Sequence, residues 1–252
     1  MKLKHLSVVP VLALSLMATS AQAVVIDFIK LTENSAANGG LGESYWSTLT
    51  IPGSFLPNTY GLQITGHASV DAPAVAGGPA DTTQFAYLDW GTAGLGVCKD
   101  SKNPPAGAHP GSNTNRCNPG SDDNVTDHEY LEFVFDQDVR VDNLWFNNNH
   151  DFGFDSGDKV TIGVGPQAMM IDDAGGSFPG TAFDVALGYA NGPNGIGAFN
   201  VKQGEKLWVA FNNEQFYVSA MEVSPVPLPS ALWLFGTALV GFVGIGRRIN
   251  VS

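Results

Sequence analysis

Short runs of alternating apolar and polar residues dominate residues 24–224 and limit the folds that this chain can adopt. Between residues 129 and 136, for example, Leu131, Phe133 and Phe135 share one side of an extended chain. The same alternation recurs at residues 159–164, 206–211 and 216–220. Glycine, asparagine, aspartate and proline separate these runs, so each run predicts a β-strand with one buried face.

Further strands are predicted at residues 24–30, 45–51, 61–69, 85–90, 140–147, 168–171 and 181–187. Residues 24–224 show no sustained apolar stripe of helical period. Many short strands separated by turn signals are typical of sandwiches and barrels. We therefore predict an all-β ectodomain over residues 24–224, built as a two-sheet, jelly-roll-like β-sandwich. An up-and-down barrel is the alternative.

The charge distribution excludes several classes of partner. The 252-residue chain has a net charge of −12, and all of its acidic residues lie between Asp27 and Glu222. Four of its twelve basic residues lie at the two ends, so the part between carries a net charge of −16. Nucleic-acid binding needs a basic face, so we predict no nucleic-acid partner. The same charge disfavours contact between this part and an anionic membrane.

Residues 1–23 have the features of a secretory signal peptide. Lys2 and Lys4 provide the positive start, and an apolar stretch follows at residues 8–17. Ala21-Gln-Ala23 fits the small-x-small cleavage pattern, which predicts a mature chain starting at Val24. An uncleaved anchor and a buried helix are the alternatives.

Residues 225–249 have the features of a membrane-spanning tail. Residues 231–246 carry no charge, and with the three residues before them they approach the roughly 20 residues needed to cross a bilayer. Arg247 and Arg248 follow directly, as the positive-inside rule requires of an exported chain that stops there. A buried core helix is the alternative.

The order of Val226-Pro227-Leu228-Pro229, a short span and the pair Arg247-Arg248 resembles the PEP-CTERM sorting signal of Gram-negative bacteria. In that family an exosortase recognises a Pro-Glu-Pro motif and processes the tail; here Leu228 replaces the glutamate. The resemblance covers about 25 residues. It implies export through the inner membrane, exosortase as a partner, and a final location at the cell surface or outside the cell, beside exopolysaccharide. It implies a route rather than a biochemical activity.

Cys98 and Cys117 are the only cysteines, and 18 residues separate them. In an exported chain an even cysteine pair predicts a disulfide. Closing a loop of this size stabilises a fold by about 3 kcal/mol in the chain-entropy model. Two free thiols or a metal-binding pair are the alternatives.

The densest acidic cluster lies between Ser121 and Glu129. Calcium takes six to eight oxygen ligands from carboxylates, amides and main-chain carbonyls. Asp122, Asp123, Asn124 and Glu129 supply such oxygens from one segment, so we predict them as calcium ligands and calcium as a cofactor. The spacing differs from that of an EF-hand loop. A solvated acidic loop is the alternative.

A second polar segment, residues 147–158, contains His150 and Asp151 and follows Trp145. A tryptophan ring beside polar side chains suits the binding of a sugar, so we predict these three residues as a ligand rim. A second set of metal ligands in this segment is the other functional interpretation. Asparagine and aspartate also favour turns, so a plain connecting loop is the alternative for the polar residues. For Trp145 the alternative is a place in the core.

Catalytic motifs are missing from the sequence. It contains no Gly-x-Ser-x-Gly elbow and no His-Glu-x-x-His zinc motif. We therefore predict a protein that is not an enzyme, with a structural or adhesive role in the exopolysaccharide or biofilm layer. The alternative is a calcium-dependent carbohydrate-binding module, and a less favoured one is a polysaccharide hydrolase.

Overall fold

A computed structural model describes residues 22–33, 40–51, 61–69, 82–100, 117, 120, 123–148, 154, 158, 160–165 and 199–226. The strands predicted at 168–171 and 181–187 lie outside these residues, as do His150, Asp151 and nearly all of the predicted signal peptide and tail. Within the described part of the chain, no helix has the length and apolar character needed to span a membrane.

The described residues form an all-β fold, as the alternation predicts, with one short helix. The strands are β1 (Val24–Asp27), β2 (Ser44–Trp46), β3 (Leu49–Ile51), β4 (Leu62–Ala68), β5 (Thr82–Asp89), β6 (Gly94–Cys98), β7 (Glu129–Phe135), β8 (Val139–Asn147), β9 (Val160–Val164), β10 (Phe199–Val201), β11 (Lys206–Phe211) and β12 (Tyr217–Pro225). Helix α1 spans Phe28–Glu33.

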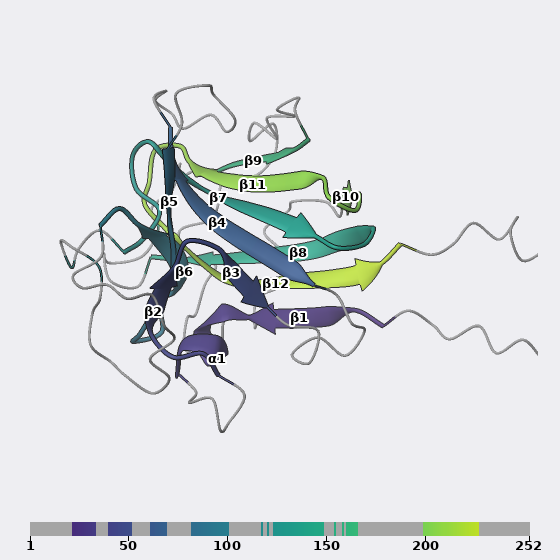
Figure 1. Ribbon diagram of the computed structural model, residues 1–252, viewed down its shortest axis with the longest axis horizontal. Coiled ribbons are helices and arrows are strands. Elements are labelled where there is room, and N and C mark those ends of the chain that lie inside the picture. Colours follow the sequence, from purple (N-terminus) through teal and green to yellow (C-terminus); the bar gives the residue numbers. More distant parts are fainter. Residues whose placement is uncertain are drawn as a thin grey trace, which may run out of the picture.

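The strands form one continuous antiparallel sheet that curls into a barrel-like shape (Figure 1). Nine strands follow each other in the order β10-β8-β12-β6-β5-β4-β7-β11-β9. Outside this path, β1 pairs with β12, β2 with β5 and β3 with β4. This continuous path replaces the two-sheet sandwich that the sequence predicted. The order along the path is not sequential, so the fold is not an up-and-down barrel either.

Strand β5 is the reason for this continuity. Its first residues pair with the end of β4, and its later residues, Phe85–Asp89, pair with β6. The close approach of β4 to β5 depends on Gly66, because a Cβ atom there would lie 2.5 Å from the carbonyl oxygen of Phe85. One strand therefore belongs to both halves of the structure and joins them.

The core lies inside the curled sheet and is formed by the apolar residues that alternate with polar ones along each strand. Leu131, Phe133 and Phe135 of β7 are buried there. Leu207 and Val209 of β11 lie directly opposite two of them in the strand register, at Phe133 and Leu131. This regular burial is the reason that period-two sequence runs located the strands.

At the start of the chain, β1 is shorter than the predicted strand at residues 24–30. The backbone amide of Lys30 donates to Oδ1 of Asp27 at 2.8 Å, so Asp27 caps the first turn of α1. The apolar residues Phe28, Ile29 and Leu31 then bury their side chains from a helix. A cap and one helical turn thus replace the second half of the predicted strand.

The barrel has two ends that differ in what they carry. Strand β1 begins and β12 ends at one end, because Val24 pairs with Val223 and Pro225 pairs with Val139. We call it the terminal end; the tip of β12 and the start of β1 lie on the right in Figure 1. At the opposite end, which we call the far end, β12 and β7 begin and β8 finishes.

Candidate functional site

The described part of the acid-rich segment that the sequence singles out lies at the far end, where Asp123, Asn124 and Glu129 are buried and Asp127 is exposed. Oε2 of Glu129 accepts hydrogen bonds from the backbone amide of Thr126 at 3.0 Å and from its hydroxyl at 2.9 Å. The amide of Glu129 in turn donates to the carbonyl of Thr126 at 3.0 Å. The Glu129 carboxylate therefore closes a tight turn at the start of β7.

Asp123 is bonded to the first residue of β12. The hydroxyl of Tyr217 donates to Oδ1 of Asp123 at 2.7 Å, and Asp123 is 5% exposed. Asp89, 3% exposed, is a second carboxylate that interacts with the same hydroxyl. Burial first, and then the negative charges of Asp89 and Asp123, raise the pKa of Tyr217 far above its ordinary value. The hydroxyl stays protonated and links the start of β12 to the end of β5 and to the loop that contains Asp123.

Asp123 and Glu129, which the sequence predicted as calcium ligands, thus accept hydrogen bonds from groups of the protein itself. Asn124 is also buried, and its carbonyl accepts from the amide of Val97 at 3.3 Å. Among the residues that the structure describes, no three His, Cys, Asp or Glu side chains are grouped so as to hold a metal. Asp122 lies outside those residues. Calcium binding therefore stays a prediction.

The predicted disulfide is present in the structure. Cys98 and Cys117 are bonded, with their Cα atoms 5.6 Å apart. Both are fully buried and pack with Tyr45 and Tyr87 in a small cluster beside the main core. The disulfide thus fixes Cys117 to the end of β6.

The tryptophan predicted to stack on a sugar does not face solvent. Trp145 is 4% exposed, so its ring is not presented to a ligand, and this part of the predicted rim is wrong. Trp90 is the described tryptophan with the greatest exposure, at 36%, and lies in the turn between β5 and β6. The sequence pattern did not distinguish the two rings, because each lies in a run that alternation predicts as a strand.

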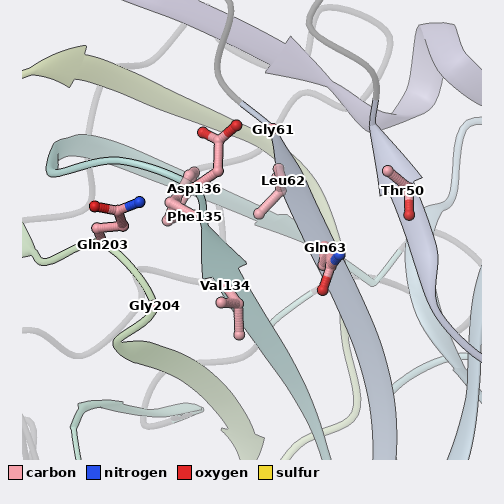
Figure 2. Close-up of a pocket in the computed structure, with 9 residues that line it drawn as sticks. All are labelled: Thr50, Gly61, Leu62, Gln63, Val134, Phe135, Asp136, Gln203 and Gly204. Atoms are coloured by element: carbon pink, nitrogen blue, oxygen red, sulfur yellow. The ribbon is translucent and has the colours of Figure 1, made fainter.

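An open pocket of about 350 Å³ lies at the terminal end (Figure 2). Its size falls within the range of roughly 300–1,000 Å³ that is usual for small-ligand sites. The core residues Leu62 and Phe135 border it but are fully buried, so the half-buried Val134 supplies its accessible apolar side chain. The remaining lining comes from β3, the start of β4, β7 with the turn after it, and the turn before β11: Thr50, Gly61, Gln63, Val134, Asp136, Gln203 and Gly204.

Hydrogen bonds donated by backbone amides hold the pocket walls together. The amide of Asp136 donates to the carbonyl of Gly61 at 3.0 Å, and the amide of Gly204 donates to the carbonyl of Phe135 at 2.9 Å. The amide of Gln203 donates to Oδ1 of Asp138 at 2.8 Å. Gly204 has a φ of 72°, a left-handed conformation that glycine adopts without strain. Three of the four chain segments around the pocket are thus fixed relative to one another, and the fourth, β3, pairs with β4.

Figure 2 shows how the polar side chains are distributed around the pocket. Asp136 and Gln203 lie on one side, and Gln63 and Thr50 lie on the other. These groups supply a carboxylate acceptor, a hydroxyl and two amides that both donate and accept. No motif in the sequence indicated them, because isolated glutamines and threonines on solvent-facing positions look alike before the fold brings them together.

Comparisons of the chain with protein-family models, with curated proteins and with solved structures found no match.

Proposed function

We propose that this chain is an exported protein of a Gram-negative bacterium, sorted by its tail and placed in the cell-surface or extracellular matrix. There it acts as a structural or adhesive component of the exopolysaccharide layer. One observation carries the proposal: the first and last strands of the barrel are neighbours, with Val24 paired to Val223. Both terminal segments therefore join the barrel at the same end.

This arrangement suits a chain with a leader at one end and an anchor at the other. The proposed signal peptide ends at Ala23, directly before β1, and the proposed sorting motif starts at Val226, directly after β12. Attachment through either segment leaves the far end directed away from the membrane. Exosortase and the inner membrane are then the partners of the tail, and extracellular polysaccharide is the partner of the barrel.

A polysaccharide hydrolase is less favoured. Glycoside hydrolysis ordinarily uses two carboxyl groups that flank an accessible bond. Of the nine described residues that line the pocket, Asp136 is the one with a carboxylate. Asp89 and Asp123 form a carboxylate pair, but both are buried around the Tyr217 hydroxyl.

The test is the location and mass of the mature protein in the producing cells. We expect surface material to contain a chain that starts at Val24 and lacks the segment after roughly Pro229. A Pro227→Ala/Pro229→Ala variant should accumulate in the inner membrane with its tail intact, whereas the neighbouring Ser230→Ala should be processed normally. A full-length tail in surface material, or a chain kept in the cytoplasm, contradicts the proposal.

A calcium-dependent carbohydrate-binding module is the second candidate. The observation that favours it is the pair of buried carboxylates, Asp89 and Asp123, that interact with one hydroxyl group, that of Tyr217. A cation would offset the repulsion between them. Removing that cation with a chelator would lower the melting temperature, so the melting curve distinguishes the two candidates.

A further inference from the structure

We propose that the pocket at the terminal end binds one neutral sugar unit of a polysaccharide. This inference rests on the proposed function, since it names the class of ligand through which the barrel would adhere. The pocket offers the half-buried apolar side chain of Val134, with polar groups on both sides. A pyranose ring has the matching character, with apolar C–H faces and hydroxyl groups around its edge.

The polar groups suit hydroxyls better than other ligands. A sugar hydroxyl both donates and accepts, and so do the side-chain amides of Gln63 and Gln203 and the hydroxyl of Thr50. The Asp136 carboxylate accepts two hydrogen bonds and can hold two neighbouring hydroxyls of one ring. Asp136 is exposed at the pocket wall, so its charge stays solvated when the pocket is empty.

Charge excludes acidic ligands. Of the nine described residues that line the pocket, none is basic and Asp136 is acidic. The part of the chain between its two ends carries a net charge of −16, which repels polyanions at long range. Phosphate, sulfate and uronate groups would meet a carboxylate without a cation to offset it. A neutral sugar is not repelled by this carboxylate.

The position of Asp136 depends on Gly61. A Cβ atom at residue 61 would lie 2.6 Å from Oδ2 of Asp136, so a larger residue there must displace the carboxylate. The atom in the way is the end of a flexible side chain, and the displacement therefore costs little stability. Gly61 is thus a positioning residue, and Asp136 is the residue that contacts the sugar.

The experiment measures retention of the full-length protein, purified in detergent, on immobilised glucose, galactose, mannose, N-acetylglucosamine and glucuronic acid. We expect retention on at least one neutral sugar and none on glucuronic acid. Gln203→Ala and Asp136→Asn should each weaken that retention at least tenfold. The matched control is Gln84→Ala, which removes a glutamine of β5 outside the pocket and should bind like the wild type.

A double-mutant cycle tests the role of Gly61. Gly61→Ala should weaken binding severalfold with an unchanged melting temperature, and it should have little further effect when Asp136→Asn is already present. Equal binding by the pocket variants and the wild type would overturn the proposal, as would retention on no neutral sugar or preference for glucuronic acid. Surface fractionation of the same variants separates this outcome from failure of the proposed function, because pocket variants should reach the surface normally.

Discussion

The two ends of the barrel use similar polar residues for opposite purposes. At the far end, the carboxylates of Asp123 and Glu129 accept hydrogen bonds from Tyr217 and Thr126 and are buried. At the terminal end, Asp136 and the amides around it line an open pocket. The far end therefore stabilises the fold, while the terminal end is available to a ligand.

The comparison shows that a dense polar motif is a poor guide to a binding site in this chain. A buried carboxylate loses its hydration and needs protein donors to replace it, so the buried acids of the cluster accept hydrogen bonds from within the protein. Scattered polar residues on solvent faces have no such requirement. They become a site when several strands and turns bring them around one hollow.

The largest expected effect concerns the two tryptophans. Trp145→Ala empties a buried position and should lower the free energy of unfolding by about 3–5 kcal/mol. Trp90→Ala removes an exposed ring from a turn and should change it by less than about 0.5 kcal/mol. Urea denaturation of both variants measures the difference. Equal losses would show that Trp90 is also held in the packed part of the far end.

Two glycines sharpen the contrast between the ends. A Cβ at Gly96 would lie 2.0 Å from the carbonyl oxygen of Asp123, which is backbone and has little room to move. Gly96→Ala should therefore cost about 3 kcal/mol of unfolding free energy, at the upper end of overpacking effects. Gly61→Ala meets the flexible Asp136 side chain and should cost less than about 1 kcal/mol, because restricting the unfolded chain offsets the strain. Similar melting curves for the two variants would contradict the comparison.

Removing the hydroxyl of Tyr217 should have a smaller effect that depends on pH. Tyr217→Phe leaves Oδ1 of Asp123 without this donor and should cost about 1–3 kcal/mol at neutral pH. Because the folded protein raises the pKa of Tyr217, its protonated hydroxyl stabilises the fold fully below the unfolded pKa of about 10. Above that pH, the unfolding free energy of the wild type should fall by up to about 1.4 kcal/mol per pH unit from this residue. The same alkaline slope in Tyr217→Phe would refute this role.

The smallest expected effect is that of a chelator. If protein donors satisfy the carboxylates of the far end, EDTA should shift the melting temperature by less than about 1 °C, since no bound ion is lost. Thermal unfolding followed by circular dichroism measures this. A fall of several degrees that Asp123→Asn abolishes would instead favour the calcium-dependent module and would make the far end a ligand site as well.

Much of the strand pattern was predictable because each strand has one buried face. The strands at residues 61–69, 129–136 and 206–211 were located to within a residue or two at each end. Strand β6 was missed because its five residues are all buried, which leaves no alternation to detect. Strand β10 was missed because its three residues are too few for a period to show.

The candidate site was less predictable than the fold. The disulfide followed from the cysteine count and the predicted export, and the structure confirms it. The roles of Asp123 and Glu129 depend on Tyr217 and Thr126, and Tyr217 is 94 residues away from Asp123. The sequence shows the acids but not the donors that the fold places beside them.

By itself, the sequence determined the all-β class, the burial of alternate residues and the cysteine pair, because each depends on local periodicity or on simple counting. The tertiary structure decided that one strand, β5, joins both halves into a single barrel-like sheet, that Trp145 is buried, and that Gln63, Asp136 and Gln203 surround one hollow. These features depend on which distant strands pair. Alternation along one strand carries no information about its neighbour.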